Sequence, residues 1–131
     1  MHWTYACPAC GAFLNPGESV ILVGVQDDRR TLMAFNPEPG NYEIHVPPHT
    51  HVVPGTRWEV LCPVCQKNLA MAENENLCAL DLIEGEARRR VLFSRVAGEH
   101  ATLVVADKKV TGYGEHAPTY VNFFLQMKHL L

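Results

Sequence analysis

Apolar residues along the chain gather in short runs whose length and β-branched content predict about seven short antiparallel strands. Residues 19–25 form a continuous apolar run, which predicts a strand that is covered on both faces. Residues 56–61 alternate instead, so that Trp58 and Val60 share one face of a strand that leads into Cys62. Clusters of Gly, Pro and Asn separate the runs and favour turns. The other predicted strands are residues 31–35, 42–46, 77–83, 88–96 and 101–106.

The end of the chain changes from a strand pattern to a helical one. Residues 107–114 contain two glycines and are interpreted as the end of the β region, and residues 116–131 are predicted to form a terminal helix. Pro118 suits the first turn of that helix, where an N–H group would have no intrahelical partner. We expect the helix to cover one face of the core, with self-association through it as the alternative. Its wide apolar stripe comprises Tyr120, Val121, Phe124, Leu125 and residues 127–131.

Length and composition are those of an ordinary globular protein. The chain has 131 residues, 47% of them hydrophobic and 19% charged, and a chain of this size can bury about two-thirds of its unfolded surface. We therefore expect residues 1–131 to form a single β-rich domain of the α+β class. No apolar run approaches the roughly 20 residues that span a bilayer, and the first residues lack the pattern of a secretion signal. The sequence thus predicts a cytoplasmic protein without a membrane segment.

The charge pattern argues against nucleic-acid binding. The formal net charge is -3 at pH 7, whereas binding to a phosphate backbone needs an excess of cations. The one basic cluster in the sequence is the three arginines at residues 88–90. Successive side chains of a strand point to opposite faces, so this cluster would be divided between the two faces.

One motif occurs twice and dominates the sequence. The segment from Trp3 to Leu14 and the segment from Trp58 to Leu69 both match W-x-x-x-C-P-x-C-x-x-x-L, 55 positions apart. Each copy contains a C-P-x-C turn, in which two residues between the cysteines place both sulfurs on one side. We call each C-P-x-C turn and the residues that close it a knuckle. Residues 12–57 are then an insertion between the two knuckles, which loop-closure entropy tolerates because it grows only slowly with length.

Four cysteines in two pairs favour metal binding over disulfides in a chain without a secretion signal. Two knuckles brought together form a closed tetrahedral S4 cage, which is typical of structural zinc. The predicted ligands are Cys7, Cys10, Cys62 and Cys65, and the predicted cofactor is one structural zinc ion per chain. Iron suits the same four sulfurs and is the alternative.

The C-P-A-C-G at residues 7–11 and the C-P-V-C at residues 62–65 resemble the paired knuckles of zinc-ribbon and rubredoxin-like proteins. Gln66 departs from the glycine that usually follows the second knuckle. The resemblance implies a zinc-ribbon core and carries over only the ligand role of the four cysteines. Residues 91–102 are also similar to a segment of small bacterial zinc-ribbon proteins of unassigned function.

Three weaker signals lie outside the cysteines. His45, His49 and His51 could hold a second metal ion, although they also suit a solvated loop that is stiffened by two prolines. Cys78 is interpreted as a small buried hydrophobic residue. Residues 99–100, Glu-His, could form an acid-base pair with Glu115 or His116 nearby, but adjacent side chains on a strand point to opposite faces, so we expect the pair to be part of a turn.

Three functional hypotheses follow. The first is a non-catalytic, zinc-stabilised protein-interaction or adaptor module, which binds a protein partner or associates with itself through the terminal helix. The second is a small metal-dependent enzyme with a second metal site at His45, His49 and His51. The third is a rubredoxin-like electron carrier with iron in the four-cysteine site.

Overall fold

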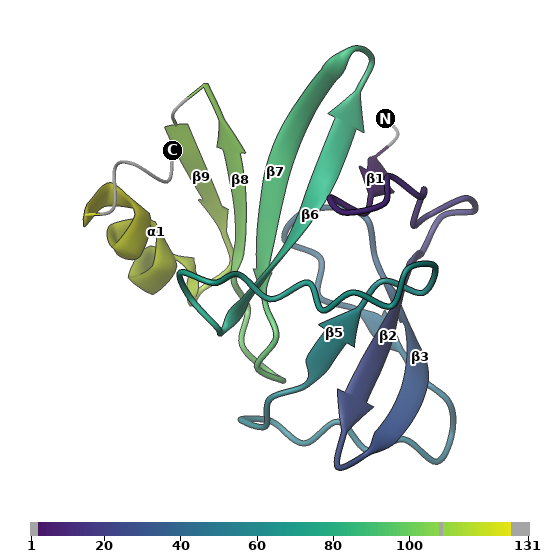
Figure 1. Ribbon diagram of the computed structural model, residues 1–131. Coiled ribbons are helices and arrows are strands. Elements are labelled where there is room, and N and C mark those ends of the chain that lie inside the picture. Colours follow the sequence, from purple (N-terminus) through teal and green to yellow (C-terminus); the bar gives the residue numbers. More distant parts are fainter. Residues whose placement is uncertain (1–2, 108, 127–131) are drawn as a thin grey trace.

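The computed structural model describes residues 3–107 and 109–126, which form two antiparallel sheets and one helix (Figure 1). The elements are β1 Thr4–Ala6, β2 Val20–Gln26, β3 Arg29–Phe35, β4 Ile44–His45, β5 Glu59–Leu61, β6 Leu77–Glu84, β7 Ala87–Ser94, β8 Thr102–Ala106, β9 Lys109–Tyr113 and α1 Ala117–Gln126. The larger sheet has the order β1-β6-β7-β8-β9, and the smaller has the order β4-β3-β2-β5. Figure 1 shows α1 beside β8 and β9, at the end of the larger sheet that lies away from β1.

The β-rich class and the terminal helix are confirmed, but the strand count is not. The described residues contain nine strands instead of about seven. The interpretation of residues 107–114 as the end of the β region is wrong, because β9 pairs with β8 along its whole length. Gly112 has a structural reason to be in this strand: a Cβ there would lie 3.1 Å from side-chain atoms of Ala117 and Val121. The glycine therefore lets α1 pack closely on β9.

Strand β1 is the other strand that the hydrophobic pattern did not predict. It has three residues and pairs with the far end of β6, where Tyr5 lies opposite Leu82. Such a short strand gives almost no alternation to recognise. The repeated motif contained the missing signal, because residues 56–61 were predicted to be a strand before the second knuckle and β1 is their counterpart before the first.

The hairpins that follow the two knuckles have the same register. In the β2–β3 hairpin, Gln26 pairs with Arg29, and in the β6–β7 hairpin, Glu84 pairs with Ala87, 58 positions later. Both are closed by two-residue turns that begin at positive φ, at Asp27 and at Gly85, which is the hairpin geometry that suits twisted strands.

The correspondence at 58 positions continues into the next strand pair. Ala34 pairs with His45 between β3 and β4, and Leu92 pairs with Leu103 between β7 and β8. The chain therefore contains one structural unit twice, as residues 3–45 (unit 1) and residues 58–103 (unit 2). Strand β9 and helix α1 follow the second copy only.

The two units exchange their first strands. Strand β1 of unit 1 pairs with β6 of unit 2, and β5 of unit 2 pairs with β2 of unit 1. Each sheet thus contains three strands of one unit and one strand of the other, in the equivalent orders β5-β2-β3-β4 and β1-β6-β7-β8. Because each unit completes the sheet of the other, neither has all its backbone partners on its own.

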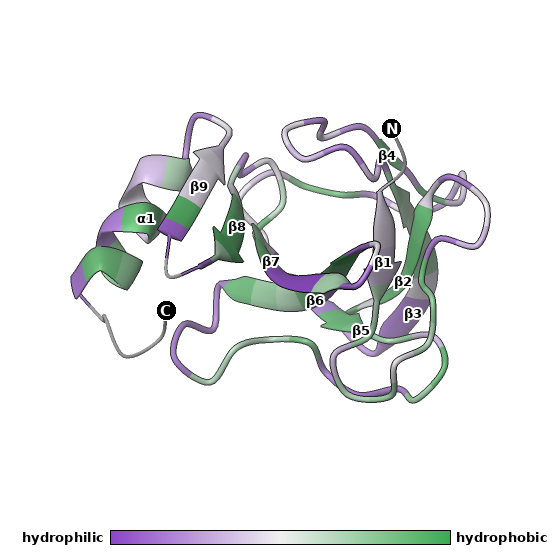
Figure 2. Ribbon diagram, turned by 90° about the horizontal axis from the view of Figure 1, so that it is seen from above, coloured by the Kyte–Doolittle hydropathy of each residue, from purple (hydrophilic) through white to green (hydrophobic). Residues whose placement is uncertain are grey.

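Two hydrophobic clusters form the core. The first lies between the sheets and joins equivalent residues of the two units, such as Leu22 with Leu80 and Cys7 with Cys62. The second lies under α1, where Ala117, Tyr120 and Phe124 pack against residues of β6, β7 and β8. Figure 2 shows the apolar character of β2, β6 and β8 beside a polar stretch of β7.

Helix α1 covers part of the larger sheet, as expected. Residues 127–131 of the predicted helix lie outside the described residues. Among the described residues, no helix has the length and apolar character needed to cross a membrane.

Candidate metal centre

The structure brings Cys7, Cys10, Cys62 and Cys65 together, with all four Sγ atoms within 4.8 Å of one another. The Sγ atoms of Cys7 and Cys65 are 3.8 Å apart, and those of Cys10 and Cys62 are also 3.8 Å apart. Four sulfurs at about 2.3 Å from a tetrahedral metal are separated by about 3.8 Å. The four thiols are therefore spaced as the ligands of one metal ion would be, with two sulfurs from each unit.

Each knuckle is closed by the same backbone hydrogen bonds. The N–H group of Gly11 donates to the carbonyl oxygen of Cys7, and that of Gln66 donates to the carbonyl oxygen of Cys62, both at 2.9 Å. The N–H groups of Cys7 and Cys62 donate in turn to Ala12 and Lys67, both at 3.0 Å. The repeated sequence motif thus becomes a repeated geometry, which aims two pairs of sulfurs at one point.

Backbone N–H groups point at the two buried sulfurs of the site. The N–H of Ala9 donates to Sγ of Cys7 at 3.3 Å, and the N–H of Val64 donates to Sγ of Cys62 at 3.4 Å. Such bonds stabilise thiolate over thiol. Cys10 and Cys65 are exposed, so one side of the cluster faces solvent.

The two buried thiols differ in pKa although their surroundings correspond. Burial opposes ionisation of Cys7, but N–H groups of Cys10 and Ala9 hold its pKa below the ordinary thiol value. Burial raises the pKa of Cys62 to about 11 against the N–H groups of Cys65 and Val64, and the neighbouring sulfur of Cys7 adds to the rise. In coupled thiols the first thiolate disfavours the second. A bound divalent cation would remove this conflict, because coordinated thiols lose their protons.

Gln66 occupies the same left-handed conformation as Gly11. Its φ is 64°, and that of Gly11 is 78°. The side chain of Gln66 compensates in part, since it donates to the carbonyl oxygen of Pro63 and accepts from Arg30. The departure from the glycine of other knuckles therefore leaves the backbone path unchanged.

We expect Gly11→Ala to lower the free energy of unfolding by about 1 kcal/mol, because a side chain at this φ is strained. Apart from Gly11 and its two chain neighbours, no atom of the described residues lies within 4 Å of the added Cβ, so the strain acts alone. Gln66→Gly is the matched change, and we expect it to raise the free energy of unfolding by less than about 1 kcal/mol, since glycine also loosens the unfolded chain. Urea denaturation of the metal-loaded proteins measures both values. A stabilising Gly11→Ala would contradict the equivalence of the two positions.

The three histidines predicted as a second site do not share such a geometry. His45, His49 and His51 are all exposed, and Nε2 of His45 lies 3.2 Å from a carboxylate oxygen of Glu43. Within residues 3–107 and 109–126, the four cysteines form the one group of three or more metal-ligating side chains whose donor atoms lie close together.

The other candidate residues have structural surroundings. Cys78 is fully buried, and burial raises the pKa of its thiol to about 12, partly offset by Arg95. It is the small buried residue that the sequence predicted. The backbone N–H of His100 donates to Nδ1 of His116 at 2.9 Å, and Nδ1 of His100 lies 3.5 Å from Glu115. The predicted proximity of these residues is therefore confirmed.

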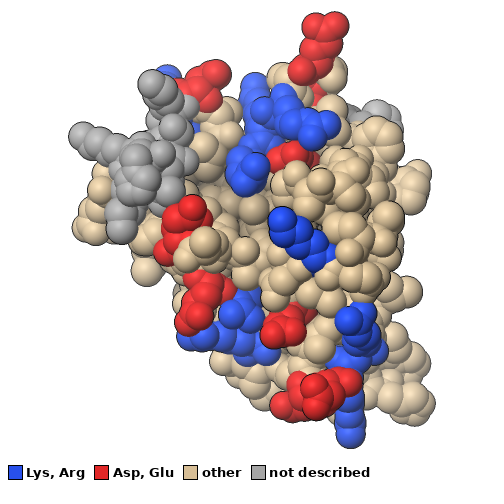
Figure 3. Space-filling view, viewed as in Figure 1, with Lys and Arg blue, Asp and Glu red and all other residues tan. Residues whose placement is uncertain are grey.

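Two of the three arginines at residues 88–90 are paired with a carboxylate. Asp81 is buried. Its carboxylate oxygens lie 3.1 Å from Nη1 of Arg88 and 3.3 Å from Nε of Arg90. On the face shown in Figure 3, basic and acidic side chains are interspersed. This distribution differs from the continuous basic stripe that suits a phosphate backbone.

The sequence did not predict a pocket between the two sheets. It has a volume of about 290 Å³ and is lined by residues of both units, among them Tyr5, Leu22, Phe35, Trp58, Leu80 and Phe93. We call it the intersheet pocket. Trp58 of the repeated motif lines the pocket, but no local sequence pattern marks it, because the lining residues lie far apart in the chain.

Comparison of the chain with protein-family models, curated proteins and solved structures finds no significant match. Its class is therefore defined by its own fold and site. The protein is β-rich, with two antiparallel sheets, a C-terminal helix and a four-cysteine cluster that could hold a metal ion.

Proposed function

We propose that the chain is a non-catalytic binding module whose single domain, built on a zinc-ribbon core, is stabilised by one zinc ion at Cys7, Cys10, Cys62 and Cys65. The observation that carries this proposal is the set of four sulfurs at tetrahedral spacing, two from each unit. Four thiolates fill all the positions of tetrahedral zinc, so no position is open for a substrate. A reducing compartment such as the cytosol suits this site, because it keeps the thiols from forming disulfides.

Metal analysis of the protein purified without added metal tests this proposal. We expect one zinc ion per chain and no visible absorbance. An iron centre is the second candidate, favoured by the exposure of Cys10 and Cys65, which would give electrons a short path to the metal. Iron would colour the protein red. A second metal at His45, His49 and His51 would instead give two metal ions per chain, one of which a triple alanine variant would lose.

The proposed protein partner is a second copy of this chain, which docks on the outer face of α1. Tyr120 and Phe124 face the core, whereas Leu125 on the same helix is 55% exposed. Single exposed apolar residues are common, so the proposal needs a measurement of mass.

We expect the native protein to sediment as a dimer and Leu125→Glu to sediment as a monomer, because a charge in an apolar contact costs desolvation energy. Sedimentation velocity over a range of concentrations gives both masses. Phe13→Glu is the matched control, since Phe13 is 64% exposed and lies beside the first knuckle, away from α1. A monomeric native protein, or a dimer that only Phe13→Glu dissociates, would contradict self-association through α1.

A further inference from the structure

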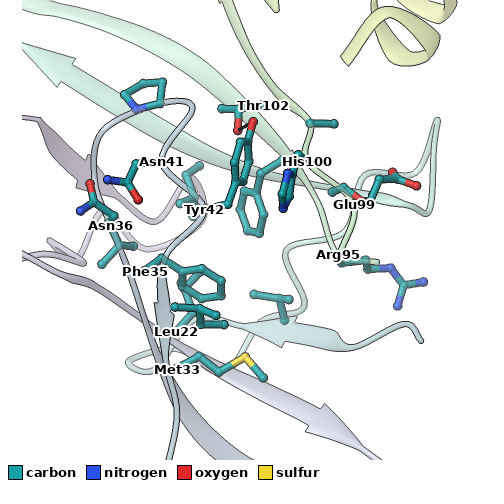
Figure 4. A pocket seen from close by; sticks show the side chains of 18 of the residues that line it. Leu22, Met33, Phe35, Asn36, Asn41, Tyr42, Arg95, Glu99, His100 and Thr102 are labelled. Atoms are coloured by element: carbon teal, nitrogen blue, oxygen red, sulfur yellow. Dashed lines mark hydrogen bonds between the residues drawn. The ribbon is translucent and has the colours of Figure 1, made fainter. Parts of the chain in front are cut away.

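The intersheet pocket is lined by equivalent residues of the two units. Leu22 corresponds to Leu80, and Phe35 corresponds to Phe93, whose ring centroid is 6.1 Å away. At the rim, Tyr42 of one unit stacks on its counterpart His100, with ring centroids 4.5 Å apart and planes 7° apart. Figure 4 shows Phe35, Tyr42 and His100 converging on the same space from different segments. The pocket therefore exists only because the two units meet.

The interior of the pocket is apolar, and two charged residues of its lining have other partners. Glu99 accepts hydrogen bonds from Ser94 and Tyr120, and Arg95 donates to carbonyl oxygens of Glu75 and Trp58. Figure 4 shows the side chains of Arg95 and Glu99 directed away from the aromatic cluster. Glu38 is also in the lining, but it is exposed. Burying an ion among the aromatic rings would therefore cost free energy. The lining thus favours a neutral occupant.

Trp58 contributes to the lining, but its one polar side-chain atom does not face the pocket. The residue is only 7% exposed, and its indole Nε1 is buried with almost no exposed surface and without a hydrogen-bond acceptor among the described residues. A molecule in the pocket therefore does not reach this donor, and the lining offers the molecule mainly apolar contact.

The volume limits the size of the occupant. An engineered apolar cavity of about 150 Å³ binds benzene, which has six carbon atoms. The intersheet pocket has about 290 Å³, which corresponds to about twelve non-hydrogen atoms on that scale. Protein interiors are otherwise close-packed, so a pocket of this size beside half-buried aromatic rings suits a flat molecule.

We propose that the intersheet pocket binds a small, neutral and apolar aromatic molecule of bicyclic size. This binding site goes beyond the proposed function and does not depend on the identity of the metal.

Two naphthalenes of similar size test the chemistry: 2-ethylnaphthalene and 2-naphthoate. The metal-loaded protein is titrated with each and followed by nitrogen-proton correlation spectra. We expect the hydrocarbon to bind and to move signals of the lining residues, and the carboxylate to bind at least about tenfold more weakly, because burying its charge costs free energy. The proposal is overturned if the hydrocarbon moves no signal of the lining residues up to its solubility limit, or if the carboxylate binds best.

A pair of adjacent valines gives a steric test. Val52 lines the pocket, whereas Val53 lies outside the lining and is 53% exposed. Val52→Trp should fill the pocket and weaken binding of 2-ethylnaphthalene by at least about tenfold, and Val53→Trp should leave the affinity unchanged. Equal affinities of the two variants would place this hydrocarbon elsewhere and reject the pocket as its site.

Discussion

Cys62→Ser is expected to abolish the cooperative thermal transition of the protein, even with zinc present. The side chain is fully buried, and its sulfur lies 3.8 Å from that of Cys10 in the other unit. Structural zinc contributes about 10–16 kcal/mol in small zinc-dependent domains, whereas a domain of this size is stable by about 5–15 kcal/mol in total. A serine oxygen is a poor zinc ligand, so most of that contribution should be lost. Circular dichroism during heating measures the transition.

Cys78→Ala is the matched control for this substitution. Cys78 is also fully buried, but it lies outside the four-sulfur cluster. Removal of its sulfur leaves a small cavity, for which we expect a loss of about 1–2 kcal/mol and a melting transition that stays cooperative. Removal of zinc from the native protein with a chelator should reproduce the effect of Cys62→Ser. If Cys62→Ser melts as cooperatively as Cys78→Ala, the metal has no structural role.

The metal-binding cluster could be predicted because its signal is local. Two residues between cysteines fix how the sulfurs point, and the second copy of the motif supplies the other pair. Apolar runs likewise predicted β2, β6, β7 and β8, and those of β2 and β8 are rich in β-branched residues. These features depend on neighbours in sequence, which is what a single chain reveals.

Strand β9 was missed for a different reason. Only Val110 among its residues is even half-buried, because the strand lies at the edge of the sheet. Without a buried face, a strand shows no alternation, and its glycine resembles a turn signal. What holds β9 in place is its pairing with β8 and the packing of α1, neither of which is visible in the local sequence.

The duplication beyond the knuckles was hidden by divergence. Some equivalent positions keep the same residue, as Leu22 of unit 1 and Leu80 of unit 2 do. Others differ: Gly24 corresponds to Leu82, and Val23 corresponds to the buried Asp81. Asp81 is tolerated because Arg88 and Arg90 pair with it, contacts that unit 1 does not need. The same divergence concealed the intersheet pocket, whose lining comes from positions far apart in the chain.

The exchange of first strands between the units predicts that neither unit folds alone. We expect two fragments, residues 1–48 and 49–131, to be unfolded separately and to form a folded one-to-one complex when they are mixed with zinc. The cut falls between the exposed Pro48 and His49, outside both units. Each fragment lacks one strand of its sheet and two of the four sulfurs. Circular dichroism of the fragments alone and of the mixture, with zinc titrated in, measures the recovery of structure.

Fragment 1–48 with Cys10→Ser separates the two causes of this association. If the metal joins the units, this variant should bind its partner at least about a hundredfold more weakly, because the shared zinc ion is the largest single contribution to the complex. Strand pairing alone would leave a weak, zinc-independent association. Independent cooperative folding of fragment 49–131 would show that unit 2 has a complete core of its own. In that case the first strand of unit 1 and its two sulfurs would be accessory, and the proposal of one domain across residues 1–131 would fail.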